Sequence, residues 1–249
     1  MKLAGKSIIV TGGAAGFGAA MCRRFAAEGA NVLVADIDLS GAEAVAAEIG
    51  SRAIAFRADV TKRADHAGMV GRALDAFGDL HGVVNNAGIV QRNTPADAVD
   101  EATFDRIFDV NVKSIYYSVL EVVPVFRKRG GGVMINLGST GGIRPRPGLA
   151  WYNASKGAVH LVSKSLAVEL ASDKIRVNAI CPALGTTAML GPVIGGPDTP
   201  ENRAKFIASI PLGRLCEPDD VANTAAFLLS DEANFMTGVC LTIDGGRTI

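Results

Sequence analysis

Tyr152 and Lys156 are the two residues whose types and spacing point most directly to chemistry. Apolar residues continue beyond them at helical spacing, so a helix places the phenol and the ammonium one turn apart on one face. A phenol keeps its proton up to about pH 10, and a nearby positive charge lowers that pKa. Such a tyrosine exchanges a proton with a substrate oxygen near neutral pH. Many surface helices also carry this spacing, so the rest of the chain has to decide.

A glycine-rich turn near the N-terminus predicts a dinucleotide site. The apolar run at residues 6–11 is typical of a strand, and Gly12, Gly16 and Gly18 separate it from a helical pattern. Strand, turn and helix in this order bind a pyrophosphate at the helix N-terminus. Gly12 would permit the turn, Gly16 would let backbone approach the phosphates, and Gly18 would let helix and strand pack closely. The alternative is an ordinary connection between a strand and a helix.

Asp36 follows the second predicted strand, residues 31–35. An acidic residue about 20 positions beyond such a glycine turn accepts hydrogen bonds from the adenosine ribose and repels a 2′-phosphate. The alternative is a cap for the predicted helix Leu39–Ile49, a task that Asp38 or Ser40 would perform equally well.

The elements that must position these residues alternate along the chain. Further strands are predicted at residues 53–56, 80–84, 133–137, 175–181 and 239–243, and helices at 61–77, through Phe104 to about Arg127, through Tyr152 to about Ser172, and at 217–230. This order predicts a single-domain α/β Rossmann fold over residues 1–249, with a doubly wound seven-stranded parallel sheet flanked by helices. A Gly- and Pro-rich stretch at about 183–205 is interpreted as a flexible substrate flap.

The polar residues that follow these strands should meet at one edge of the sheet, because ligands bind outside the carboxyl ends of parallel strands. They are Asp36, Asp59, Asn86, Ser139, Tyr152 and Pro182.

Composition excludes several classes of protein. Lys plus Arg and Asp plus Glu both number 25 in 249 residues, which gives no basic surface for nucleic acid or for an anionic membrane. No run approaches the roughly 20 apolar residues of a membrane span, and no signal peptide is evident. The cysteines (Cys22, Cys181, Cys216, Cys240) and histidines (His66, His81, His160) have no metal-like spacing. We expect a cytoplasmic protein with reduced thiols, no metal and a small-molecule substrate.

The motifs together resemble the short-chain dehydrogenase/reductase family, over essentially the whole chain. Thr11-Gly12-x-x-x-Gly16-x-Gly18 matches the family's cofactor turn, Asn85-Asn86-Ala87-Gly88 its structural motif, and Asp244-Gly245-Gly246 its C-terminal turn. Asn111, Ser139, Tyr152 and Lys156 match its catalytic tetrad. The chain is similar to the single-domain type that includes 3-oxoacyl-carrier-protein reductases and NAD-dependent secondary-alcohol dehydrogenases.

The resemblance implies hydride transfer between NAD(H) and a secondary alcohol or ketone. Tyr152 would exchange the hydroxyl proton, Ser139 would bind the substrate oxygen, Lys156 would lower the pKa of Tyr152 and bind the nicotinamide ribose, and Asn111 would hold a relay water. The implied cofactor contacts are Gly12, Ala15, Gly16, Phe17, Gly18, Asp36, Ile37, Asp59, Val60, Asn86, Ala87, Gly88, Tyr152, Lys156, Pro182, Gly185, Thr187 and Met189. The implied substrate contacts are Ser139, Gly141, Ile143, Tyr152 and Leu184, with Trp151 also lining the pocket and Arg144 and Arg146 flanking it.

Two other functions remain open. A 3-oxoacyl-thioester reductase would use the same chemistry, and Arg129 fits one position where such enzymes bind their acidic carrier, but Asp173 occupies the other. A non-catalytic dinucleotide-binding redox sensor is the second alternative.

Apolar residues on several faces of the predicted helices, among them Ile115, Tyr116, Val119, Leu161 and Leu166, indicate a homotetramer.

Overall fold

The computed structural model describes residues 1–186, 191, 193 and 199–249. The strands in these residues form one sheet in the order β3-β2-β1-β4-β5-β6-β7, and every neighbouring pair is parallel. They are β1 (Ser7–Thr11), β2 (Asn31–Asp36), β3 (Ala53–Arg57), β4 (Gly82–Asn85), β5 (Gly132–Leu137), β6 (Ile175–Pro182) and β7 (Cys240–Ile243). The predicted doubly wound, seven-stranded sheet is confirmed.

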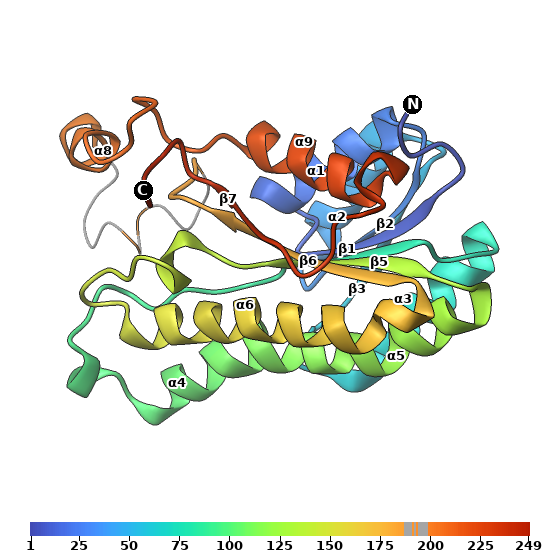
Figure 1. Cartoon of the computed structure of the whole chain (residues 1–249), viewed down its shortest axis with the longest axis horizontal. Coiled ribbons are helices and arrows are strands. Elements are labelled where there is room, and N and C mark those ends of the chain that lie inside the picture. The colour runs from blue at the N-terminus through green and yellow to red at the C-terminus, as the bar shows by residue number, and fades with distance from the viewer. Residues whose placement is uncertain (187–190, 192, 194–198) are drawn as a thin grey trace.

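Helices cover both faces of the sheet. Figure 1 shows α1, α2 and α9 on one face and α3, α5 and α6 on the other. The helices are α1 (Gly16–Ala27), α2 (Leu39–Ile49), α3 (Arg63–Phe77), α4 (Glu101–Phe108), α5 (Ser114–Arg129), α6 (Ala150–Leu170), α8 (Pro200–Ile207) and α9 (Pro218–Leu229). No helix in the described ranges combines the length and apolar character needed to cross a membrane.

Alternate residues of each strand supply the two apolar cores. In β1, Ile8 and Val10 pack with the core that contains Phe25 of α1, whereas Ile9 packs with the core that contains Phe126 of α5. Successive side chains of a strand point to opposite faces, and a parallel sheet is buried on both. This explains why the strands appear in the sequence as short, nearly continuous apolar runs.

The strand order reverses between β1 and β4, because β2 and β3 lie on one side of β1 and the later strands lie on the other. The connections therefore leave on opposite faces at this point, and a crevice opens at the carboxyl ends of the strands. The glycine turn after β1 and the turn at Asn86 after β4 both border it.

The helix predicted through Phe104 to about Arg127 is interrupted. A π-helical turn, Asp109–Lys113, separates α4 from α5. Asn111 lies in this turn and is buried among backbone groups, and one wide turn of this kind inserts an extra residue that re-aims a side chain. Periodicity does not reveal such an insertion because apolar residues continue on both sides of it.

The stretch interpreted as a flap contains regular structure at its end. Thr199 caps α8 by accepting from the Asn202 N–H at 3.2 Å, and Pro200 occupies the first turn. Two predicted cofactor contacts in this stretch, Thr187 and Met189, lie outside the described residues.

Candidate active site

The turn between β1 and α1 has the geometry of a phosphate cradle. Gly12 and Gly16 have φ values of 66° and 54°, which side chains rarely adopt. A Cβ on Gly18 would overlap the Gly12 carbonyl oxygen, so only glycine permits this approach. Helix α1 begins after Ala15, which has no side chain to cap it, and its first turn has no acidic residue. Its first N–H groups are therefore suited to an anion, and the cradle fits a pyrophosphate.

Asn86 ties this cradle to β4. Its Nδ2 donates to the carbonyl oxygens of Thr11 and Gly12 at 2.8 and 3.0 Å. Thr11 Oγ1 in turn accepts from the N–H groups of Asn86 and Ala87, both at 3.1 Å. The two turns are thus one hydrogen-bonded unit, and the first does not depend on glycine flexibility alone.

Asp36 ends β2 beside the glycine turn. Its two carboxylate oxygens accept from the N–H groups of Ala14 and Asp38, both at 3.0 Å. The capping alternative falls to Asp38, whose side chain accepts from Gly41 N at the start of α2. Asp36 is therefore not consumed by a helix cap. Ile37 beside it is 60 % exposed.

Asp59 and Val60 follow β3, the next strand outward. Asp59 accepts from both the N–H and the hydroxyl of Thr61, and the Val60 carbonyl oxygen bonds His66 Nε2 at 3.0 Å. The structure places both residues at the crevice edge of the sheet, but neither lines the pocket described next.

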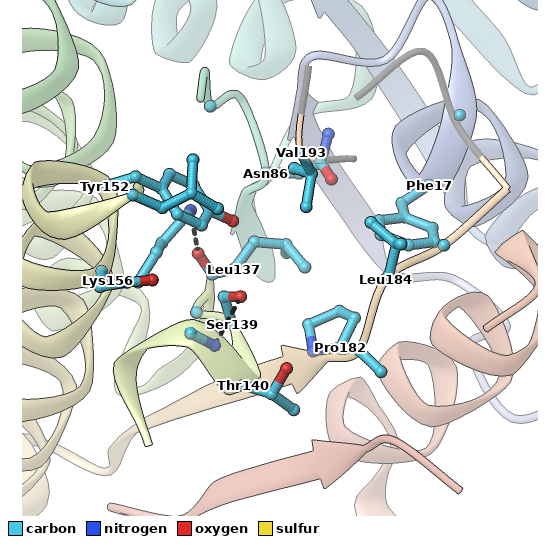
Figure 2. A pocket seen from close by; sticks show the side chains of 18 of the residues that line it. Phe17, Asn86, Leu137, Ser139, Thr140, Tyr152, Lys156, Pro182, Leu184 and Val193 are labelled. Carbon is cyan, nitrogen blue, oxygen red and sulfur yellow. Dashed lines mark hydrogen bonds between the residues drawn. The ribbon is translucent and has the colours of Figure 1, made fainter. Parts of the chain in front are cut away.

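One pocket joins the glycine turn to α6. Figure 2 shows Tyr152 and Lys156 on one side of it, Ser139 and Thr140 below, and Phe17 and Leu184 on the other side. The predicted residues that line it are Gly12, Ala15, Gly16, Phe17, Asn86, Ala87, Gly88, Ser139, Gly141, Tyr152, Lys156, Pro182, Leu184 and Gly185. Residues from both ends of the sequence therefore meet here.

Lys156 and Tyr152 form the buried wall of this pocket. Lys156 Nζ donates to the Leu137 carbonyl oxygen at 2.7 Å and lies 6.0 Å from the centre of the Tyr152 ring. Burial lowers the pKa of Lys156 to about 8. Burial raises the pKa of Tyr152, and a hydrogen bond from Ser139 opposes that rise. The lowering of the Tyr152 pKa by Lys156, expected from the sequence, is not seen: burial raises this pKa, and the group that lowers it is Ser139.

Ser139 is held by its neighbours on both sides. Its Oγ accepts from Gly141 N at 3.0 Å, and its own N–H donates to His160 Nε2 at 3.3 Å. Burial, followed by the charge of Lys156, lowers the pKa of His160, so the ring is neutral at pH 7. Since Nε2 accepts, the proton of the neutral ring resides on Nδ1. From the sequence His160 is expected to be a structural or surface residue, and the structure places its ring against the Ser139 backbone.

Asn111 is buried behind the pocket and bonded to protein. Its Oδ1 accepts from Ile89 N at 2.8 Å, and its Nδ2 donates to Ile89 O at 2.9 Å and to Ser155 Oγ at 3.0 Å. A Cβ on Gly88 would lie 3.2 Å from Asn111 Oδ1 and 3.4 Å from Lys156 Nζ. Asn111 therefore fixes the loop after β4 beside the lysine, and its relay water stays a prediction.

Two side chains lie elsewhere than the sequence indicated. Ile143 ends the 3₁₀ turn Thr140–Gly142 and is 45 % exposed, and Trp151 donates to the Ala96 carbonyl oxygen at 3.1 Å. Neither lines the pocket, because the turn directs Ile143 outward and the indole packs toward α4, edge-on to Phe104. Residues that the sequence did not single out as contacts take part instead: Leu137, Gly138, Thr140, Leu149, Asn153, Ala183 and Val193. Arg146, expected only to flank the pocket, lines it.

Comparisons with known proteins agree with this geometry. Residues 12–248 match a family model described as enoyl-(acyl carrier protein) reductase. The chain is 50 % identical to a 4-formylbenzenesulfonate dehydrogenase of Comamonas testosteroni, covering all of both chains. It is 39 % identical to 2-(S)-hydroxypropyl-CoM dehydrogenase 3 of Xanthobacter autotrophicus, covering 99 % of this chain and 98 % of the relative.

Solved structures agree as well. A 3-ketoacyl-(acyl-carrier-protein) reductase from Brucella melitensis, complexed with NADH, superposes with a TM-score of 0.94 at 47 % identity, covering 99 % of this chain and 100 % of the other.

Proposed function

The chain belongs to the short-chain dehydrogenase/reductase family of oxidoreductases acting on CH–OH donors, and from that premise we propose that Tyr152, Ser139 and Lys156 carry its acid–base chemistry. One observation carries the proposal: these three side chains and the glycine cradle line the same pocket. A bound nicotinamide dinucleotide supplies the hydride acceptor or donor. The protein supplies binding, orientation and proton transfer.

In the oxidation direction Tyr152 accepts the hydroxyl proton of a secondary alcohol. Ser139 donates a hydrogen bond to the same oxygen and fixes its distance from the phenol, while His160 holds the Ser139 backbone in place. Tyr152 must be the phenolate to accept this proton, and Lys156, with its Nζ 6.0 Å from the ring centre, is the positive charge that would favour that form. Such acid–base assistance contributes about 10²–10⁴-fold, and holding substrate and cofactor together supplies the remainder.

For the cofactor we propose NAD rather than NADP. Asp36 ends β2 with its carboxylate beside the turn, where it would accept from the ribose hydroxyls and meet a 2′-phosphate as a like charge. Ala14 and Ala15 in the turn and Ile37 beside Asp36 offer no positive charge to compensate.

A 3-oxoacyl-thioester reductase is the second candidate, supported by the likeness to the Brucella enzyme. The surface argues less well for an acidic carrier protein. Arg129 is paired with Asp79 at 3.2 Å, and Asp173 is paired with Arg127 at 2.7 Å. The basic position expected to meet a carrier is thus already neutralised by its own chain.

A panel of substrates tests these assignments. Aliphatic and benzylic secondary alcohols, their ketones and acetoacetyl thioesters are assayed with NAD(H) and NADP(H). The name of the Comamonas relative includes an aromatic sulfonate aldehyde, so anionic benzylic compounds belong in the panel. We expect turnover of an alcohol–ketone pair with NAD(H); exclusive turnover of thioesters would favour the second candidate, and dinucleotide binding with no turnover would favour a redox sensor.

We further propose a homotetramer, in which a second copy covers an apolar groove on α5 and α6. The groove is lined by Phe108, Val112, Ile115, Tyr116, Val119, Val162 and Leu166, and Tyr116 is 57 % exposed. The resemblance to the family implies that these helices pair across a two-fold axis. Sedimentation should show a tetramer at micromolar concentration, and Tyr116→Glu should weaken it; a stable monomer would contradict the proposal. The cytoplasmic location expected from the sequence stays a prediction.

A further inference from the structure

The loop that enters α6 places an arginine in the pocket. Arg146 lines the same pocket as Tyr152 and Ser139 and is half-buried. Asn153 Nδ2 donates to its carbonyl oxygen at 2.9 Å and fixes the backbone at this point. The guanidinium carbon lies 4.3 Å from the centre of the Phe206 ring, on α8. Asn153 thus holds the backbone of Arg146 and Phe206 holds its guanidinium, so the side chain does not extend freely into solvent.

The stacked guanidinium has donors to spare. Stacking on a ring uses the face of the group, whereas its five N–H donors point outward in its plane. No described residue accepts a hydrogen bond from them. Arg176 shows the contrast: its guanidinium is also partly buried, but it donates to the carbonyl oxygens of Leu228, Ser230 and Met236. An arginine built only for structure is satisfied in this way.

The surroundings of Arg146 are positive. Arg247 is only 9 % exposed, and its Nε is buried without a hydrogen-bond partner in the described part of the chain. Arg144 donates to the Arg247 carbonyl oxygen at 2.6 Å, which brings a third guanidinium to the group. Burial, and then the charge of Arg247, lower the pKa of Arg146 to about 10, so it remains protonated at neutral pH.

Asp244, a carboxylate whose charge acts on Arg247, is already engaged by its own turn. Asp244 accepts from the N–H groups of Gly246 and Thr248 and from the Thr248 hydroxyl. Figure 1 shows the C-terminus and α8 at the same end of the molecule. Burying clustered guanidinium groups that have no ion-paired acid is energetically unfavourable, and binding of an anion offsets this penalty.

We propose that Arg146 binds an oxyanionic group of the substrate, a carboxylate or a sulfonate, while Tyr152 and Ser139 act on the alcohol or ketone at the other end of the same molecule. The inference rests on the proposed function of this pocket and names the class of substrate it takes. The charge of Arg247 adds to the positive potential at Arg146, and the planar guanidinium of Arg146 can donate to two anionic oxygens at once.

Binding of three matched ketones tests the proposal without relying on turnover. Calorimetry on the full chain with saturating NAD measures Kd for 4-acetylbenzoate, 4-acetylbenzenesulfonate and the neutral 4-acetylbenzamide. The wild type should bind an anion about 10- to 100-fold more tightly than the amide, the usual size of a hydrogen bond to a charged group. The tighter of the two anions identifies the group that the site prefers.

Variants locate the effect. Arg146→Gln should abolish the preference for the anion, and Arg146→Lys should keep part of it through its point charge. Arg72→Gln makes the same chemical change on the exposed surface of α3 and should keep the whole preference. Equal Kd values for anion and amide in the wild type, absence of anion binding, or an undiminished preference in Arg146→Gln would each overturn the proposal.

Turnover separates this inference from the proposed function. If the wild type and Arg146→Gln both reduce the amide and the anions equally well, the function stands and the inference fails. If the anions bind through Arg146 but no panel ketone is reduced by NADH, the inference stands and the function fails.

Discussion

Asp36, at the β2 end of the crevice, and Arg146, at the α6 end, are both charged, but they are held in different ways. Both carboxylate oxygens of Asp36 accept from backbone N–H groups of its own loops. Arg146 rests on an aromatic ring and donates to no described residue. Asp36 is therefore fixed by its own chain, whereas the donors of Arg146 have no acceptor among the described residues and are available to a ligand.

This difference indicates how the two ends select. A charge that is fixed by its own backbone excludes ligands of the same sign, which suits discrimination against a 2′-phosphate. A charge with unpaired donors selects by attraction, because a ligand that lacks the complementary group leaves those donors unsatisfied. The crevice thus combines exclusion at the end of β2 with attraction at Arg146.

The largest effect is expected from a variant that leaves both ends intact. Tyr152→Phe removes the proton path, so kcat should fall by about 10²–10⁴-fold. NAD binding should stay nearly unchanged, because the dinucleotide is held mostly elsewhere. Retention of more than about a tenth of the wild-type rate would remove Tyr152 from its assigned role. Tyr117→Phe, the same change on the α5 surface, is the control.

Asp36→Ala removes the charge at the β2 end of the crevice. The wild type should prefer NAD over NADP by at least about 10²-fold in kcat/KM, equivalent to ~2.7 kcal/mol. The variant should narrow that ratio, chiefly by improved use of NADP. Asp38→Ala is the matched control: it removes the α2 cap and about 1 kcal/mol of stability but should leave the ratio alone. Equal use of both cofactors by the wild type would show that Asp36 does not face the ribose.

A third charge, Lys156, is buried between the two ends and should make stability depend on pH. Its pKa is about 8 in the folded protein and 10.5 as the ordinary value. Below pH 8 both states bind the proton and the folded state bears the full cost of the buried charge. From pH 8 to 10.5 the folded state releases the proton first, so the cost disappears as pH rises.

Relative to that of Lys156→Met, the free energy of unfolding of the wild type should therefore increase by up to about 3 kcal/mol between pH 7 and pH 10.5. Urea unfolding of both proteins across this range measures it. The exposed Lys128→Met should show no such trend. A difference that stays constant with pH would mean that Lys156 keeps its ordinary pKa.

The smallest effect is expected from the residue behind Ser139. His160→Ala leaves the Ser139 N–H without its acceptor, and we expect about a 10-fold loss of kcat/KM. His160→Gln offers a carbonyl oxygen and should recover part of the rate. The Kd for NAD separates positioning from general damage, since it should not change; a parallel loss of NAD binding would indicate a structural role only.

Most of the fold follows from the sequence because its signals are local. Apart from the interrupted helix between Phe104 and Arg127, predicted strands and helices are found within one or two residues. The cradle needs glycine for local reasons: positive φ at Gly12 and Gly16, and close approach at Gly18. Asp36 was less certain, because nothing in the sequence distinguishes it from Asp38 as a cap. The structure distinguishes them, because Asp36 accepts from Ala14 N in the glycine turn whereas Asp38 accepts from Gly41 N at the start of α2. The first of these bonds depends on how β2 meets the turn.

The substrate side was predicted less well for a physical reason. Ile143, Arg146 and Trp151 lie in or next to a Pro-rich loop without periodicity. Hydrophobicity suggested that Ile143 and Trp151 line the pocket, whereas in the structure Arg146 lines it and the other two do not. The partners that determine their directions, Ala96 and Phe206, are distant in sequence. The π-helical turn around Asn111 was not predicted either, and the partner of Asn111, Ile89, is likewise distant in sequence.

The strand order also bears on how the molecule assembles. Strands β1 to β3 pair among themselves, as do β4 to β7, and β1 with β4 is the one pairing in the described sheet that joins these halves. That pairing closes the stretch of chain from Ile8 to Gly82, at a cost in loop entropy. The cradle belongs to the first half and Tyr152 to the second. A dinucleotide that contacts both halves of the sheet binds only when the halves are paired, so it should stabilise the pairing of β1 with β4. Loss of the cofactor should therefore loosen the molecule first between these two strands.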